Sequence, residues 1–201
     1  TDGGATYGQV AKLTASDAAS GDRFGYSVAT DGQKVVVGAY DNDDAGSKSG
    51  SAYVFALPST DYAQLAKLVA GDAAADDSFG ISVAIDGETV IIGATGAGPG
   101  GAVYVLRTND GGATYVEVAK LTASDASSSD YFGSSVAIDG DTVVVGAQND
   151  DDAGTSSGSV YVFEKNTWGT YDQVTKLTAA DAAAGDMFGI SVAFDGDTVV
   201  V

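Results

Sequence analysis

Phe24-Gly-Tyr-Ser-Val-Ala-Thr-Asp-Gly-Gln-Lys-Val-Val-Val-Gly-Ala39 is the stretch that decides the fold of this chain, because it recurs. Closely related stretches begin at Phe79 and Phe132, and a shorter one begins at Phe188. The four Phe-Gly pairs are 55, 53 and 56 residues apart. A near-constant period of this length is the signature of a repeat architecture, so the rest of the sequence is best interpreted one repeat at a time.

The period divides the chain into five segments. Residues 1–23 match the end of a repeat, residues 24–78, 79–131 and 132–187 form three complete repeats, and residues 188–201 begin a further one. We therefore expect about 3.7 repeats, each completing its core against its neighbours. The partial repeats at the two ends lead us to expect a fragment of a larger propeller or of a longer repeat array.

Each repeat contains four short strand signals, which in the first complete repeat are residues 25–30, 34–40, 51–57 and 62–69. The second is an uninterrupted β-branched run, typical of a strand buried on both faces. Asp31-Gly32 separates the first two, and Asp-Gly between apolar strands is a strong hairpin signal because glycine accepts a positive φ. Four antiparallel strands with short connections predict an all-β fold of propeller blades.

Composition narrows the class of function. The chain has 28 acidic and 9 basic residues, for a formal charge of −19, and it contains no His and no Cys. This charge repels nucleic acid and anionic membrane surfaces. Without His or Cys, the usual general base, the thiol nucleophile and the commonest transition-metal ligands are missing. We therefore expect a non-enzymatic protein with no nucleic-acid partner and no direct membrane insertion.

The motifs Phe-Gly-x-Ser-Val-Ala, Val-Val-Val-Gly-Ala and Gly-Ser-Val-Tyr-Val-Phe together resemble the FG-GAP repeat, the blade unit of the integrin α-subunit propeller. The resemblance covers nearly the whole chain. It implies a β-propeller of an extracellular or cell-surface protein that acts in adhesion or recognition, often with calcium. Tyr40, Thr95 and Gln148 stand where the family has proline, and the tight Asp-Gly turn replaces the family's calcium loop, so the repeats resemble its short-hairpin variant.

Calcium has another candidate location in this chain. The connections between the second and third strands contain Asp41-Asn-Asp-Asp-Ala-Gly46 and Asn149-Asp-Asp-Asp-Ala-Gly154, whereas the second repeat has no acid there. Clustered carboxylates beside a glycine bend suit Ca²⁺, which takes about 6 to 8 oxygen ligands. The candidate ligands are Asp41, Asp43, Asp44, Asp150, Asp151 and Asp152. The alternative is a solvated turn in an acidic protein.

Two further recurring features have alternative interpretations. One lysine occupies the same place in each fourth strand, at Lys12, Lys67, Lys120 and Lys176, where it blocks edge pairing or forms a salt bridge to a neighbouring blade. Two aspartates precede each Phe-Gly, as in Asp17 and Asp22. Hydrogen bonds to the local backbone explain these pairs, or they contribute to a cation site.

The sequence thus predicts an extracellular or cell-surface module for adhesion, recognition or structural assembly, stabilised by calcium if the acidic loops bind it. Its partner would be a protein, a glycan or further copies of itself in a fibre or surface layer. The alternative is an accessory propeller of a larger secreted enzyme whose catalytic residues lie elsewhere. The recurring Phe24, Phe79, Phe132 and Phe188 are predicted core residues, and the single Trp168 is a candidate contact for a ligand or subunit.

Overall fold

The computed structural model describes residues 8–57 and 61–201, which form β-strands and no helices. Three antiparallel sheets contain four strands each, in chain order, and a two-stranded hairpin follows them. The strands are β1 (Val28–Thr30), β2 (Lys34–Ala39), β3 (Ser51–Ala56) and β4 (Gln64–Leu68); β5 (Ser82–Asp86), β6 (Thr89–Ala94), β7 (Ala102–Arg107) and β8 (Val116–Leu121); β9 (Phe132–Asp139), β10 (Thr142–Ala147), β11 (Ser159–Lys165) and β12 (Tyr171–Leu177); and β13 (Ala193–Asp195) and β14 (Thr198–Val200).

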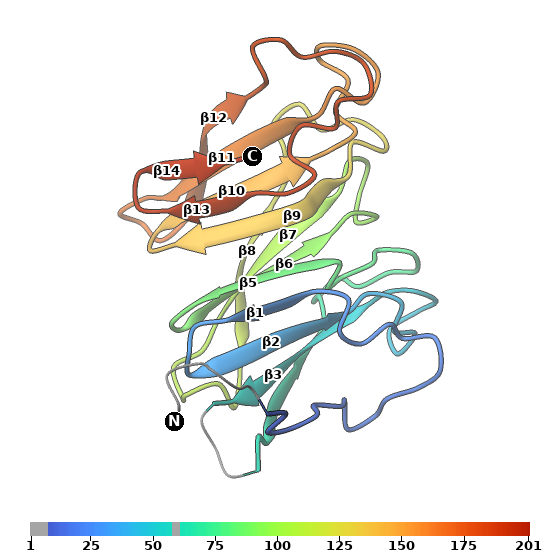
Figure 1. The fold of residues 1–201 in the computed structure, drawn as a ribbon, viewed down its shortest axis with the longest axis vertical. Helices are drawn as coiled ribbons and strands as arrows, with labels where there is room; N and C mark the ends of the chain where they lie inside the picture. The colour runs from blue at the N-terminus through green and yellow to red at the C-terminus, as the bar shows by residue number, and fades with distance from the viewer. Residues whose placement is uncertain (1–7, 58–60) are drawn as a thin grey trace.

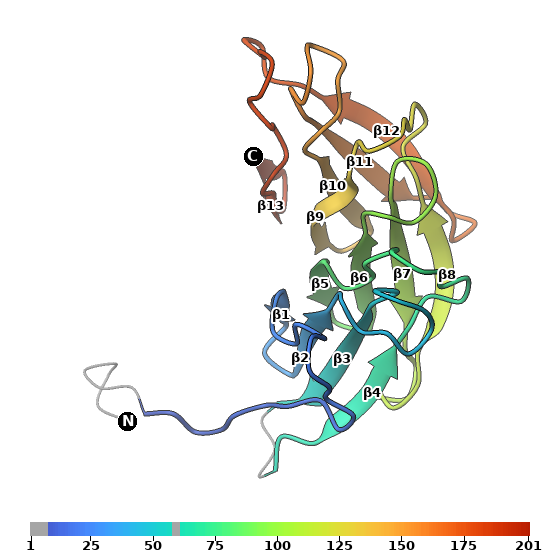
Figure 2. The same ribbon diagram turned by 90° about the vertical axis from the view of Figure 1, so that its right-hand side faces the viewer.

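The sheets are arranged as consecutive propeller blades. The first strands β1, β5, β9 and β13 lie next to one another in order, and β4, β8 and β12 form the outer side of the arc (Figures 1 and 2). This confirms the predicted fold class. Among the described residues, no helix has the length and hydropathy of a membrane span.

The predicted strands occur at the expected places, and in the first sheet the first and last strands are shorter than predicted. Residues 25–27 precede β1 there, and Gly25, which has a φ of 90°, lies in a turn. The hairpin prediction is confirmed at the second repeat, where Asp86 pairs with Thr89 and Gly87 has a φ of 55°. The middle strands are buried, as the β-branched runs predicted.

Neighbouring sheets approach one another through backbone as well as side chains. A Cβ added at Gly93 would lie 2.1 Å from the carbonyl oxygen of Gly133 in the next repeat, and Gly38 and Gly146 show the same close approach. The Ser82 hydroxyl donates a hydrogen bond to that Gly133 carbonyl at 2.7 Å. The Gly-Ala and Phe-Gly motifs are thus the two sides of one contact between repeats.

Apolar side chains fill the space around these contacts. One core lies between the first and second sheets and another between the second and third. Phe79 and Phe132 are fully buried in them, and their rings meet Tyr104 and Tyr161 edge to face at 5.3 and 5.5 Å. Phe24 and Phe188 are only half-buried, so the core prediction holds fully for the two central phenylalanines.

The glycine contact gives a direct test of how the sheets pack. We expect Gly93→Ala to destabilise the protein by about 3 kcal/mol or more, because the new methyl group meets a backbone carbonyl that cannot move independently. Chemical denaturation measures the change. Gly8→Ala is the matched control, since none of the described residues has an atom within 4 Å of its added Cβ, and equal stability of the two variants would contradict this account of the packing.

Candidate functional site

The carboxylates of the two acidic loops are engaged within the protein. Asp41 forms an ion pair with Arg23, with 2.7 Å between the carboxylate oxygen and Nε. Asp43 and Asp151 each accept a hydrogen bond at 2.7 Å from a backbone N–H of their own loop, at Lys48 and Ser156. The fourth candidate of these loops outside the third cluster, Asp44, pairs with Lys67. The candidates Asp41, Asp43, Asp44 and Asp151 thus make separate contacts, and the structure does not bring them together into one cluster.

The lysines of the fourth strands organise a recurring arrangement, which we call the Lys–Tyr–Asp cluster. Each cluster joins a lysine on the outer strand, a tyrosine on the third strand and an aspartate from the connection that leads into that sheet. Its members are Lys67, Tyr53 and Asp17; Lys120, Tyr104 and Asp72; and Lys176, Tyr161 and Asp125. These contacts support the interpretation that the three lysines form salt bridges. The lysines also lie on the outer edge strands of their sheets, as the alternative interpretation requires.

The position of the lysine in the three clusters is nearly constant. The tyrosine hydroxyl donates to the aspartate in the second and third clusters, at 2.8 and 2.9 Å, whereas the Tyr53 hydroxyl has no hydrogen-bond partner among the described residues. The ammonium nitrogen lies 2.6, 2.6 and 2.7 Å from the aspartate oxygen in the three sheets, and 5.4, 5.0 and 5.1 Å from the centre of the tyrosine ring. Such a cation over an aromatic face is favourable. Among the described residues Lys12 forms no ion pair.

The third cluster gathers the most charge. Lys176 also pairs with Asp150, at 3.1 Å, and with Asp152. The Asp150 side chain is only 5% exposed, and it accepts hydrogen bonds from the Ser159 hydroxyl at 2.8 Å and the Tyr161 hydroxyl at 3.0 Å. In the first sheet the corresponding residue is the neutral Asn42, which accepts the same serine hydrogen bond from Ser51. The third sheet therefore buries one more carboxylate than the first.

Protonation equilibria reflect these contacts. The hydrogen bonds from Lys120 and Tyr104 lower the pKa of Asp72. Burial opposes the charge on Lys120, but the hydrogen bonds to Asp72 and Tyr104 and the electrostatic attraction to both groups together outweigh it and raise the pKa of the ammonium to about 12. At Asp150, burial would raise the pKa, yet the hydrogen bonds from Ser159 and Lys176 lower it. The clusters therefore hold both partners in their charged forms at neutral pH.

One set of carboxylates has the spacing of a metal site. Oxygens of Asp125, Asp150 and Asp152 all lie within 4.8 Å of one another. Two of these residues are candidates from the acidic loops, and the third comes from the preceding connection. A cation already lies among them, however, because the Lys176 ammonium pairs with all three. A divalent ion therefore fits this cluster only if the lysine side chain leaves it.

The two aspartates that precede each Phe-Gly make different contacts. Asp22, Asp77, Asp130 and Asp186 each accept a hydrogen bond from the backbone N–H three residues earlier, at 2.6 to 2.8 Å. This confirms the local-backbone interpretation for the second member of each pair. The first member belongs to the Lys–Tyr–Asp cluster in the three complete sheets.

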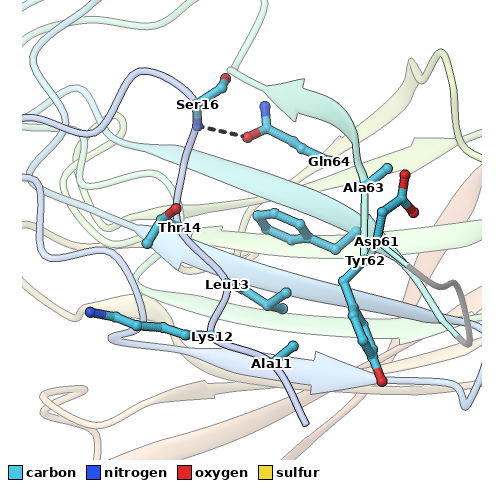
Figure 3. Close-up of a pocket in the computed structure, with 10 residues that line it drawn as sticks. Ala11, Lys12, Leu13, Thr14, Ser16, Asp61, Tyr62, Ala63 and Gln64 are labelled. Atoms are coloured by element: carbon cyan, nitrogen blue, oxygen red, sulfur yellow. Dashed lines mark hydrogen bonds between the residues drawn. The ribbon is translucent and has the colours of Figure 1, made fainter.

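Shallow grooves lie beside the outer strands of the three sheets. Figure 3 shows the first groove, of about 250 Å³, where the Ser16 N–H donates to the Gln64 side chain at 2.9 Å. Corresponding hydrogen bonds join Gly71 to Glu117 and Ser124 to Gln173. These hydrogen bonds hold the connection of one repeat against the outer strand of the next, so the residues that line the grooves mainly join neighbouring repeats.

Trp168 is the most exposed large apolar side chain in the described residues, at 89%. It lies in the turn between β11 and β12, where the Asn166 side-chain oxygen accepts hydrogen bonds from the backbone N–H groups of Trp168 and Thr170, at 2.9 and 3.2 Å. The Asn166 amide also donates to Asp172 at 2.9 Å. The indole therefore projects from an ordered turn.

Comparison with known proteins identified a repeat family and similar solved structures. A profile described as the FG-GAP repeat matches residues 7–55, 62–106, 115–163 and 171–201. Among 68 matching chains of solved structures, the crystal structure of the Saccharomyces cerevisiae Sqt1 aligns with a TM-score of 0.49 and 14% identity. That alignment covers 80% of this chain and spans 37% of the Sqt1 chain. A search of curated proteins found no match.

The buried carboxylate of the third cluster gives a prediction for stability. We expect Lys176→Met to cost about 3 kcal/mol, because it leaves Asp150 buried without its cation. Lys120→Met should cost about 1 kcal/mol or less, since its partner Asp72 is more than half exposed. Urea denaturation of both variants measures the difference.

The double variant Lys176→Met/Asp150→Asn is the control. It should recover much of the loss, because Asn42 fills the corresponding place in the first sheet. Equal destabilisation by the two lysine substitutions, or no recovery in the double variant, would contradict the role given to Asp150.

Proposed function

This chain belongs to the FG-GAP repeat family, and on that premise we propose that it is a non-enzymatic β-propeller module for extracellular recognition, adhesion or structural assembly. The proposal rests on one observation, which is that the most closely clustered carboxylates of the protein already have partners. The carboxylates that a catalytic or metal-dependent site would employ are paired with lysines that hold the connections onto the sheets. Such a scaffold leaves its exposed surface available for binding.

Trp168 is the feature of that surface best suited to contact a ligand. A flat indole held on an ordered turn presents a large area at small entropic cost. The formal charge of −19 disfavours polyanionic ligands and leaves neutral glycans and basic or neutral protein surfaces. Repeats of this family are typical of extracellular proteins, which supports a location outside the cell or at its surface.

The test of ligand contact uses a panel of neutral polysaccharides in affinity electrophoresis. We expect Trp168→Ala to weaken retardation by the polysaccharide that binds by about tenfold or more, because a central aromatic anchor contributes a large share of binding energy. Tyr26→Ala is the matched control, because this exposed ring lies in the first repeat, just before β1. A loss of binding in the Tyr26 variant alone would rule out Trp168 as the contact.

Calcium enters the proposal at the third cluster. With Lys176 in place the cluster already holds a cation, so millimolar Ca²⁺ should change the melting temperature of the unmodified protein very little. In Lys176→Met the three carboxylates lose that cation. We expect this variant to gain about 4 °C when free Ca²⁺ is about ten times its dissociation constant.

Lys120→Met controls for the loss of a lysine, because among residues 8–57 and 61–201 only one carboxylate pairs with Lys120. Thermal unfolding with Ca²⁺ and with a chelator measures the effect. A large Ca²⁺-dependent rise in the unmodified protein would instead show that the ion binds the native acidic loops.

A further inference from the structure

A pocket of about 330 Å³ lies at the start of β8, the outer strand of the second sheet (Figure 2). Its walls all belong to the second repeat, and they include Arg107 and two valines, Val116 and Val118, which are 65% and 45% exposed. The second sheet packs against a four-stranded sheet on each side, so the pocket lies in the middle of the row of sheets. Its volume suits a small ligand or one unit of a polymer.

The corresponding place on the first sheet is covered. Leu65 corresponds to Val118, because the β-bulge of each outer strand leaves that residue without a pairing partner. The connection between β7 and β8 lies over the half-buried Leu65: a Cβ added at Gly112 would be 3.2 Å from Leu65 Cδ1, and Leu65 and Tyr115 pack against the same core. A connection from the second repeat therefore fills this position on the first sheet.

The connection between β11 and β12 does not fill the same position on the second sheet. It has five residues between Lys165 and Tyr171, whereas the stretch 108–114 of the β7–β8 connection has seven. A Cβ added at Gly169 would meet no atom of the described residues within 4 Å. The shorter connection thus leaves Val118 exposed and the pocket open.

Trp168 lies in this shorter connection. It stands three residues before Tyr171, as Gly112 stands three residues before Tyr115. Burial raises the pKa of the Tyr171 hydroxyl and the positive charge of Arg107 opposes that shift, so this end of β12 lies near Arg107. Because Gly112 lies against the outer strand of the preceding sheet, the same offset puts the indole beside the opening of the pocket.

The walls combine apolar surface with both signs of charge. Arg107 pairs with Glu88 at 3.8 Å, and their side chains are 42% and 64% exposed. An exposed pair at this distance is weak, so its N–H groups and carboxylate oxygens remain available to a ligand. The Thr114 hydroxyl donates to Asp110 at 2.6 Å, which holds the loop side of the pocket in place. These walls suit an uncharged ligand with an apolar face and several hydroxyl groups.

We propose that this pocket binds one sugar unit of a neutral polysaccharide. Its C–H face lies against the two valines, its hydroxyls bond to Arg107 and Glu88, and Trp168 closes the outer side. The charges of the pair cancel locally, and the formal charge of −19 repels anionic polymers, so a neutral ligand is favoured. This inference rests on the ligand contact proposed above for Trp168 and assigns the rest of its binding site.

Affinity electrophoresis of the whole chain tests the pocket, with hydroxyethylcellulose, laminarin, dextran and galactomannan as neutral probes and carboxymethylcellulose as an anionic one. We expect at least one neutral polymer to retard the protein and carboxymethylcellulose not to. Arg107→Met should weaken that retardation by about tenfold or more, because it removes the hydroxyl-binding guanidinium. Val118→Ser should weaken it by about fivefold, because it removes apolar contact area.

Two substitutions outside the pocket are the matched controls. Arg23→Met removes the other arginine of the chain, which pairs with Asp41 in the first repeat. Val174→Ser alters the valine that occupies the bulge position in the third sheet, where it is 49% exposed. Both controls should be retarded like the unmodified protein, and equal melting temperatures of all variants show that they are folded.

The outcomes separate this inference from the proposed function. If Trp168→Ala weakens retardation but Arg107→Met and Val118→Ser behave like their controls, the pocket is not the site and only this inference fails. Retardation by carboxymethylcellulose comparable to that by the neutral polymers would also overturn it. If none of the neutral polymers retards the protein, the pocket and the ligand contact proposed for Trp168 both fail.

Discussion

The close approach of backbones between successive repeats is the constraint on which the structure depends. At Gly38, Gly93 and Gly146 a side chain of even one carbon would collide with the carbonyl of the next Phe-Gly glycine. That carbonyl is buried, and a serine hydroxyl satisfies it from the preceding sheet. A buried carbonyl without a donor would cost about 1–3 kcal/mol, so the serine is as necessary to the contact as the glycine. The close-packed glycine, the donating serine and the Phe-Gly pair recur together because all three form the same contact between repeats.

A second recurring arrangement neutralises part of the excess negative charge. The chain has 9 basic residues against 28 acids, and three of its lysines are placed as internal cations, each between a tyrosine ring and the carboxylate of an incoming connection. In the third sheet one ammonium serves three carboxylates, where acids alone would resemble a calcium site. A flexible lysine that neutralises several carboxylate oxygens explains how three aspartates lie together in the third cluster without requiring a metal ion.

The period, the hairpins and the buried middle strands could be predicted because each depends on residues close in sequence. The candidate site could be predicted only in part from residues close in sequence. Asp150 and Asp152 stood out as members of an acidic run, but the run also contained Asp151, whose carboxylate turns to its own loop at Ser156. The sequence marks Asp125 as one of the two aspartates before Phe132-Gly133, and no local pattern marks it as a neighbour of Asp150. Arg23 and Asp41 pair across 18 positions, and no local pattern pointed to that contact.

By itself, the sequence determined that this protein is a series of four-stranded units, since strand, turn and repeat signals act over a few residues and recur without ambiguity. The tertiary structure alone decided which acids meet and what neutralises them. Lys176 reaches Asp125 across 51 positions because the fold places an outer strand over the connection entering its own sheet. Local propensity carries no information on such a distance, whereas packing of one sheet on the next fixes it.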